Sequence, residues 1–185
     1  MNSERNISII GGAGHVGFPL GLMLSSKGYK VSLIDKHVEN MNKINNGEIP
    51  FLEEKSEKLL KGMIKQKRIR ATNKLNETVN SKYVIICIGT PINDRLKPNL
   101  KNFINFFYQL RKFLKKNQIV IIRSSIYPGI CNKIYKIIKK KCKNLSYCPE
   151  RIVQGKSITE LPRLPQLVSG KSKRAIIESG KLFQR

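Results

Sequence analysis

The sequence Gly-Ala-Gly-His-Val-Gly at residues 12–17 is the first pattern that could perform chemistry. It follows a short β-branched run and opens an apolar, helix-like stretch, which is the setting of a dinucleotide-binding turn. There Gly12 would permit the tight turn, Gly14 would let a pyrophosphate approach the backbone, and Gly17 would let the helix pack closely against the strand. The N–H groups at the start of the helix would then face the phosphates.

An acidic residue, Asp35, ends the next strand-like run, 18 residues after Gly17. At this place in a dinucleotide-binding unit, a carboxylate accepts hydrogen bonds from the ribose hydroxyls and repels a 2′-phosphate. The pattern therefore predicts NAD as the cofactor in preference to NADP, a preference that the neighbouring Lys36 weakens slightly. The alternative is a glycine-rich turn that binds no ligand.

Small polar clusters also follow three apolar strand-like runs further along the chain. They are Gly89-Thr90-Pro91, residues 123–129 (RSSIYPG) and residues 147–151 (YCPER). An ordinary strand-ending turn would explain any one of them. Because the carboxyl ends of parallel strands meet at the ligand-binding edge of a sheet, their convergence is more informative than any single cluster.

The elements that must position these clusters alternate along the chain. Continuous apolar runs such as YVIICI at 83–88 are typical of strands that are buried on both faces. The patterns predict strands at 7–10, 30–35, 69–72, 83–88, 118–122 and 145–148, and helices at 16–26, 36–46, 52–66, 103–114 and 130–142. Strands that alternate with helices indicate an α/β fold, a doubly wound Rossmann-type sheet that is mostly parallel, with helices on both faces. We expect residues 1–185 to form one NAD-binding domain.

The net charge of +24 raises the possibility of a polyanionic partner. Residues 101–185 carry 20 basic and 3 acidic side chains, and KIYKIIKKKCK at 133–143 holds many of the lysines. Its isoleucines recur at helical spacing, which predicts a solvated outer helix with the lysines on its exposed face. Without interleaved aromatic residues or a nucleic-acid motif, this interpretation is favoured over a nucleic-acid patch, and no specific nucleic-acid partner is expected.

Other functional classes are disfavoured by composition. The four cysteines have no C-x-x-C spacing and there are only two histidines, so no metal site is expected. Scattered cysteines fit the reducing cytoplasm. No apolar run is long enough to span a membrane, and the first residues do not resemble a signal peptide.

Five motifs in order resemble the N-terminal, NAD-binding domain of the UDP-glucose/GDP-mannose dehydrogenase family. They are GGAGHVG at 11–17, NNGEIPFLE at 45–53, CIGTPI at 87–92, RSSIYPG at 123–129 and YCPERIVQG at 147–155, with Asp35 between the first two. The Pro-Glu-Arg form of the last motif is most similar to the branch that acts on UDP-N-acetylmannosamine. Enzymes of this family oxidise the C6 alcohol of a nucleotide sugar to a carboxylate in two NAD-dependent steps.

The resemblance implies a role for each matching position. The backbone at His15 and Val16 would line the pyrophosphate. Thr90 would contact NAD, and Ser125, where the family usually has Thr, would lie near the reacting centre.

The last motif would serve the substrate. Enzymes of this family form a thioester on a cysteine during the reaction, and Glu150 would assist the acid–base steps and the hydrolysis of this thioester. Glu150, Arg151 and Ile152 would contact the nucleotide sugar. Some relatives have a second glutamate where this chain has Gln154, which leaves a two-carboxylate mechanism open.

The family also has a dimerisation domain, a second Rossmann-like domain and a nucleophilic cysteine in a Gly-Gly-x-Cys motif, none of which matches this sequence. Cys148 is interpreted as a packing residue. We therefore expect the chain to be the N-terminal part of a longer enzyme and to be inactive alone. Two alternatives stay open: a hydroxyacid-type Rossmann oxidoreductase, or a basic nucleic-acid-binding module on a Rossmann shell.

Overall fold

Seven strands form one sheet in the order β3-β2-β1-β4-β5-β6-β7, in which only the β6–β7 pair is antiparallel. The computed structural model describes residues 5–51, 53, 56–90, 100–150, 161 and 163–184. The strands are β1 (Asn6–Ile10), β2 (Lys30–Ile34), β3 (Ile69–Thr72), β4 (Tyr83–Ile86), β5 (Ile119–Ile122), β6 (Leu145–Tyr147) and β7 (Ser169–Gly170). The strand order reverses at β1, as in a doubly wound fold, and the predicted fold class is confirmed.

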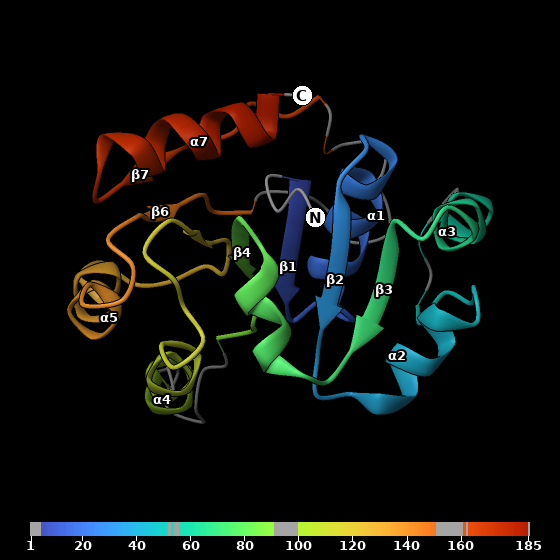
Figure 1. The fold of residues 1–185 in the computed structure, drawn as a ribbon, viewed down its shortest axis with the longest axis horizontal. Coiled ribbons are helices and arrows are strands. Elements are labelled where there is room, and N and C mark those ends of the chain that lie inside the picture. Colours follow the sequence, from blue (N-terminus) through green and yellow to red (C-terminus); the bar gives the residue numbers. More distant parts are fainter. Residues whose placement is uncertain are drawn as a thin grey trace.

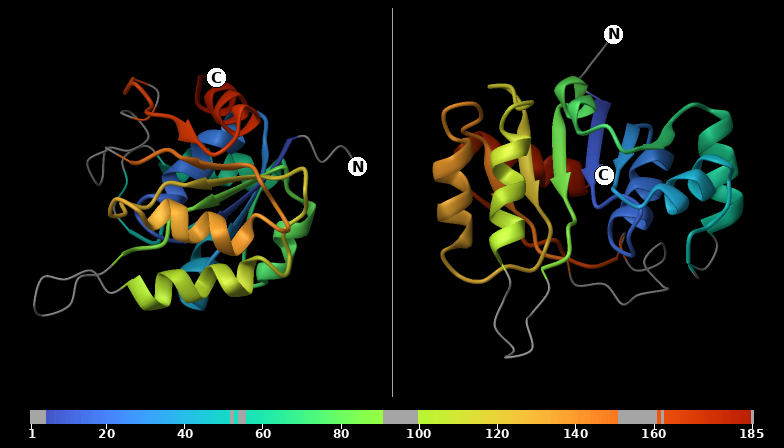
Figure 2. Two further views of the ribbon diagram at one scale, coloured as in Figure 1. Left: turned by 90° about the vertical axis from the view of Figure 1, so that its left-hand side faces the viewer. Right: turned by 90° about the horizontal axis from the view of Figure 1, so that it is seen from below.

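Helices cover both faces of this sheet (Figure 1). One face packs against α1 (Gly17–Ser26), α2 (Val38–Asn45), α3 (Ser56–Lys65) and α7 (Lys173–Gln184). The other face packs against α4 (Leu100–Leu110), α5 (Ile130–Ile138) and a short 3₁₀ helix, η2 (Leu75–Asn80). The two views in Figure 2 show the resulting three layers. None of the described helices combines the length and apolar character that crossing a bilayer requires.

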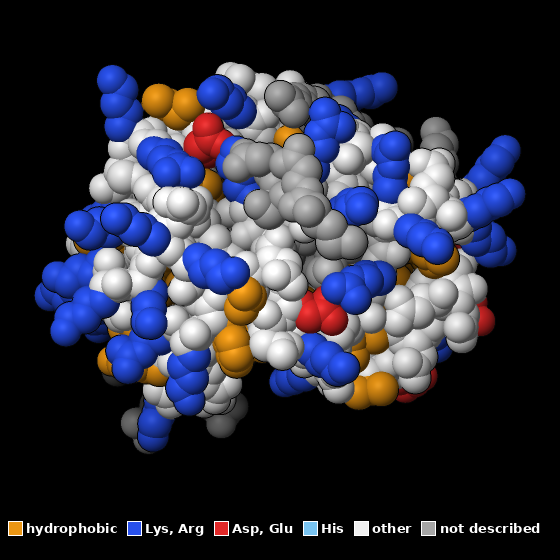
Figure 3. Space-filling model, viewed as in Figure 1, with side chains coloured by type: hydrophobic (Ala, Val, Ile, Leu, Met, Phe, Trp, Pro, Cys, Tyr) orange, Lys and Arg blue, Asp and Glu red, His pale blue; other side chains and the backbone are white. Residues whose placement is uncertain are grey.

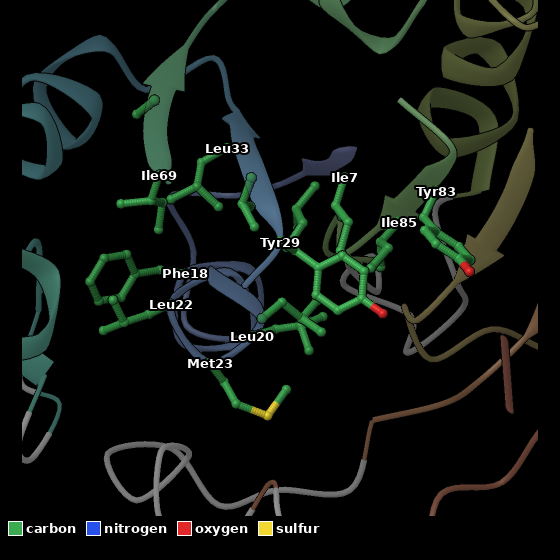
Figure 4. Packing of buried hydrophobic residues seen from close by; sticks show 14 of the residues in the cluster. Ile7, Phe18, Leu20, Leu22, Met23, Tyr29, Leu33, Ile69, Tyr83 and Ile85 are labelled. Carbon is green, nitrogen blue, oxygen red and sulfur yellow. The ribbon is translucent and has the colours of Figure 1, made fainter. Parts of the chain in front are cut away.

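The core forms where apolar runs meet. All four residues of β4 and all four of β5 are buried, as expected of central strands. Nine of the ten residues of α1 are buried, because this helix lies between the sheet and its neighbouring elements. Figure 4 shows Phe18, Leu20 and Leu22 of α1 among side chains from β1, β2 and β4. This packing fixes the start of α1, and hence the glycine turn before it.

Two elements were not predicted. The strand β7 has two residues, Ser169 and Gly170, and carries no apolar pattern. The helix η2 has the sequence LNETVN, with only Thr78 buried. Boundaries also moved: α4 spans Leu100–Leu110 instead of 103–114, and α5 ends at Ile138 instead of 142. Cys142 is nevertheless fully buried, because a turn that follows α5 keeps it on the apolar face.

The basic segment after Gly129 is the outer helix that the sequence predicts. Ile130, Ile134 and Ile138 are buried against the sheet. The lysines of this segment are exposed: Lys133, Lys136, Lys139, Lys140, Lys141 and Lys143. Their positive charge is therefore solvated rather than part of the core.

One acidic residue of α7, Glu178, forms a hydrogen bond and an ion pair with residues at the start of β4. Its Oε2 accepts a hydrogen bond from the Tyr83 hydroxyl at 3.1 Å and lies 2.7 Å from Lys82 Nζ, and its Oε1 lies 3.7 Å from Lys181 Nζ. The hydrogen bond from Lys82 is the largest cause that lowers the pKa of Glu178 below its ordinary value of 4.5.

This lowered pKa predicts a pH-dependent contribution to stability. A carboxylate whose pKa falls on folding stabilises the fold above its unfolded pKa, and this stability is lost as the pH drops through the folded value. We expect Glu178→Gln to be less stable than the unmodified chain at pH 7, and the difference to shrink as the pH falls below 4.5. Urea unfolding of both proteins from pH 7 to pH 3 measures it. A difference that stays constant over this range would contradict the role of the ionised carboxylate.

Candidate functional site

The carboxyl ends of four strands lie level at one edge of the sheet. Ile34, Ile10, Ile86 and Ile122 are successive register partners across β2, β1, β4 and β5. The segments that follow these residues therefore begin side by side, and Figure 2 (right view) shows the strand arrows pointing to this edge. Since the strand order reverses between β1 and β4, this is the edge at which doubly wound proteins bind their ligands.

The glycine turn is held against its neighbours by backbone contacts. Gly11 has a φ of +78°, and a Cβ at this position would lie 2.6 Å from the Cys87 carbonyl oxygen. The left-handed residue of the turn is thus Gly11, one residue before the predicted Gly12. Gly12 is required for another reason, because a Cβ there would lie 2.7 Å from the Ile9 carbonyl oxygen. A Cβ on Gly17 would overlap the Gly11 carbonyl oxygen, which confirms its predicted close packing.

The start of α1 leaves several backbone donors unused. The N–H groups of His15, Val16 and Gly17 have no hydrogen-bond acceptor in the described part of the chain. No side chain caps this helix, and its first turn contains no acidic residue. A Cβ on Gly14 would meet only the Gly11 carbonyl oxygen, at 3.4 Å, so the turn is open on that side. A helix N-terminus with unused N–H groups and an open glycine backbone fits the pyrophosphate of NAD.

Asp35 lies directly beside this turn. Its Oδ2 accepts a hydrogen bond from the Ala13 N–H at 3.0 Å, and its Oδ1 accepts from the N–H groups of Lys36 at 2.7 Å and His37 at 3.2 Å. An ionised carboxylate has about four acceptor positions, so these three bonds leave capacity for a ribose hydroxyl. The structure therefore brings the acid and the glycines together, as the sequence predicts.

The hydroxyl residues after β4 and β5 also meet. Thr90 Oγ1 donates a hydrogen bond to the Ser125 carbonyl oxygen at 2.8 Å, which joins the two loops. Ser124, whose side chain is buried, donates to the Ile88 carbonyl oxygen at 2.6 Å. Ser125 itself is exposed at the edge. Both predicted hydroxyl residues thus lie at this edge, shortly after Cys87 and Ile88, whose backbone atoms pack against Gly11.

Glu150 forms an ion pair that sequence reasoning missed. Its carboxylate contacts the Arg123 guanidinium, and the two side chains are 11% and 1% exposed. Arg123 also donates to Gln166 Oε1 at 2.7 Å and lies over the Phe183 ring, 4.8 Å from its centroid. Glu150 is therefore held at the end of β6 by an arginine from the end of β5.

A signal for this pair was present in the sequence. Arg123 directly follows the four buried residues of β5, and a cation at such a position needs a buried carboxylate. A second missed residue is Phe51, whose ring lies 4.0 Å from that of His15 and covers one side of the glycine turn.

The cysteines of this region are packing residues. Cys148 is fully buried, as predicted, and burial raises the pKa of its thiol. Burial also raises the pKa of Cys87 to about 12. Because the thiolate is the nucleophilic form, neither cysteine is suited to attack a substrate at neutral pH.

The remaining predicted positions lie outside the described residues. These are Pro91, Arg151, Ile152 and Gln154. Their proposed contacts stay predictions from the sequence.

Comparison with known proteins agrees with this geometry. Residues 5–184 match the UDP-glucose/GDP-mannose dehydrogenase family, NAD binding domain. The chain is 30% identical over 175 residues to the UDP-N-acetyl-D-mannosamine dehydrogenase of Methanococcus maripaludis, covering 92% of this chain and 40% of that protein. It is 28% identical over 168 residues to the UDP-glucose 6-dehydrogenase of Rickettsia prowazekii, covering 89% of this chain and 38% of that one. The chain thus spans about 40% of the length of these curated relatives.

Solved structures show the same fold. The UDP-D-ManNAc dehydrogenase of Pyrococcus horikoshii superposes with a TM-score of 0.89 at 25% identity, covering 97% of this chain and 44% of that one. The GDP-mannose dehydrogenase of Pseudomonas aeruginosa, at 22% identity, gives 0.88 over 96% of this chain and 44% of its own. The family match extends far beyond the glycine turn that hydroxyacid dehydrogenases share, and so decides against that alternative. The chain belongs to the UDP-glucose/GDP-mannose dehydrogenase family, of which residues 5–184 form the NAD binding domain.

Proposed function

We propose that this chain serves as the NAD-binding portion of a nucleotide-sugar dehydrogenase that oxidises a sugar C6 alcohol to a carboxylate. UDP-N-acetylmannosamine is the preferred candidate substrate, and UDP-glucose is the second. Relatives that carry these two names match the chain at 30% and 28% identity, and the Pro-Glu-Arg sequence at 149–151 favours the first. We also propose a cytoplasmic location, because its four cysteines are free thiols.

The observation that carries this proposal is the start of α1 together with Asp35. The unused N–H groups of His15, Val16 and Gly17 would hold the pyrophosphate, while Asp35 would accept hydrogen bonds from the adenosine ribose. When bound, NAD supplies a hydride acceptor for the alcohol. The protein residues at this edge bind and orient it.

The other residues of the edge have proposed roles nearer the sugar. Thr90 would contact NAD, and the hydroxyl of the exposed Ser125 would donate a hydrogen bond near the reacting centre. Glu150 would exchange a proton with the substrate, with its place fixed by Arg123. Arg151 and Ile152 would contact the nucleotide sugar.

Segments outside this chain would supply the rest of the chemistry. The relatives named above are more than twice as long as the matched region, which supports treating residues 1–185 as one cofactor-binding domain of a larger enzyme. Dimerisation is proposed to involve the same outside segments.

Removal of the Asp35 carboxylate tests the cofactor. At a concentration of about 100 times its Kd, a ligand stabilises a fold by about 2.7 kcal/mol, which raises the Tm of a chain this size by about 5–11 °C. We expect NAD to produce such a rise in the unmodified chain, NADP a smaller one, and Asp35→Ala to lose most of the NAD effect. Thermal unfolding with and without each dinucleotide measures these shifts.

The matched control is Glu39→Ala. Glu39 is also acidic, lies on the adjacent helix α2 and has a side chain that is 83% exposed, so its removal changes the net charge equally. It should keep the full NAD effect. The cofactor assignment is wrong if the unmodified chain shows no rise at millimolar NAD. With NAD bound, a further rise with UDP-N-acetylmannosamine that exceeds the rise with UDP-glucose would support the proposed substrate.

A further inference from the structure

The amino ends of β1, β2 and β3 border a cavity of about 140 Å³, at the edge of the sheet opposite the glycine turn. Most of the residues that line the cavity are polar or charged, among them Asn6, Lys30, Ser32, Arg68, Arg70 and Asn80. Figure 1 looks toward this edge, where the chain begins. None of the residues assigned to the dinucleotide lies here.

This cavity exists because the covering element is short. The connection from β3 to β4 contains only η2, six residues long, where a full helix would cover the sheet face. The side chains that β1, β2 and β3 place beneath it are polar near the amino ends, at Ser8, Ser32 and Arg70, and apolar only further on, at Ile10 and Ile34. The polar half of this face is therefore suited to a polar occupant.

The charge around the cavity is strongly positive. Four cationic side chains line it, from Lys30, Lys67, Arg68 and Arg70, and the one acidic side chain of the lining, Glu77, pairs with Arg70. Lys30, Lys67 and Arg68 have no carboxylate partner within the described ranges.

A further guanidinium adds to this charge. A Cβ placed on Gly28 would lie 3.4 Å from an Arg68 nitrogen and 3.9 Å from an Arg5 nitrogen, so both arginines approach the same point. Figure 3 shows Lys and Arg side chains surrounding the few acidic ones on this face. Like charges brought together around a hollow favour the binding of an anion.

The size of the cavity narrows the class of anion. A water molecule needs roughly 10–15 Å³ of such space, so the cavity holds on the order of ten waters. Pockets for whole drug-sized ligands typically measure about 300–1,000 Å³, so this cavity is too small for a ligand of that size. We infer that the amino edge of the sheet binds the phosphate groups of a small polyphosphate or phosphate ester, at a second site that does not overlap the NAD site.

Pyrophosphate is the probe for this site. The ¹⁵N-labelled full chain is saturated with NAD, so that the glycine turn is occupied, and pyrophosphate is then added at constant ionic strength. Amide chemical-shift changes are expected at Lys30, Ser32 and Arg68–Arg70, and not at Gly12–Gly14. The double variant Lys30→Ala with Arg68→Ala should bind pyrophosphate at least tenfold more weakly. Shifts confined to the glycine turn, or spread evenly over exposed lysines, would overturn the inference.

The matched control is the double variant Lys139→Ala with Lys140→Ala. It removes the same charge from the exposed end of the α5 segment and should keep the affinity for pyrophosphate. If both double variants bind pyrophosphate equally weakly, the affinity depends only on the net charge of the protein, and the inference of a specific site is overturned. Repeating the titration with ADP separates the two sources of the phosphate: tighter binding of ADP identifies a nucleotide, and tighter binding of pyrophosphate identifies a free polyphosphate.

Discussion

Gly17→Ala is expected to destabilise the chain by about 3 kcal/mol and to abolish NAD binding. A Cβ at this position would overlap the Gly11 carbonyl oxygen and lie 2.8 Å from Gly12 Cα, and both are backbone atoms. They cannot move freely, because the N–H groups of Gly11 and Gly12 both bond to the Ile34 carbonyl oxygen on β2. The clash must therefore displace either α1 or the turn that holds the cofactor.

Thermal unfolding with and without NAD measures both parts of this prediction. For a chain of this size, about 3 kcal/mol corresponds to a fall in Tm of about 6–12 °C. Gly62→Ala is the matched control, since Gly62 lies within α3 and a Cβ there meets nothing within 4 Å. It should stabilise the chain by about 0.5–1 kcal/mol, because alanine is the better helix former. A Gly17→Ala protein as stable as the unmodified chain would contradict the packing described for the turn.

A variant of Gly14 separates binding from folding. A Cβ on Gly14 would make only an ordinary contact at 3.4 Å, so Gly14→Ala should unfold close to the Tm of the unmodified chain. If the pyrophosphate approaches the backbone here, the same variant should lose most of the stabilisation by NAD. Retention of that stabilisation would place the pyrophosphate elsewhere along the turn.

The cofactor edge could be predicted from the sequence because its determinants are local. The spacing of Gly12, Gly14 and Gly17, and the position of Asp35 at the end of β2, each follow from the geometry of one strand–turn–helix unit. The register of β4 and β5 accounts for the hydroxyl residues. Because these two strands end level, the loops that follow them begin side by side, and Thr90 lies next to Ser125. The shift of the left-handed residue to Gly11 was missed because the motif does not show which glycine has positive φ.

The ends of β5 and β6 could not be predicted in the same way. The partners of Arg123 come from three places that only the folded chain brings together: Glu150 after β6, Gln166 before β7 and Phe183 on α7. The apolar run before Arg123 indicates that this cation needs a buried carboxylate, but no sequence spacing shows which residues surround it. The polar cavity beneath η2 was missed for a related reason, since its lining comes from three strands and two connections.

Breaking the Arg123–Glu150 pair is expected to cost about 3–5 kcal/mol, because a buried charge is left without its partner. Arg123→Met removes the cation and its contact with Phe183, and Glu150→Gln removes the anion. In the double variant neither charge remains, so its loss should be smaller than the sum of the two single losses by at least about 1.5 kcal/mol. Urea unfolding of the four proteins at pH 7 gives this coupling energy.

An exposed ion pair provides the contrast. Lys61 Nζ lies 2.6 Å from Glu57 Oε1 on α3, and the two side chains are 60% and 59% exposed. Since solvent screens such pairs, Glu57→Gln should leave the midpoint of unfolding almost unchanged. Single losses at Arg123 and Glu150 that simply add in the double variant would show that the two side chains act independently. In that case Arg123 would not fix the place of the Glu150 carboxylate, and the role proposed for Glu150 would need another source of positioning.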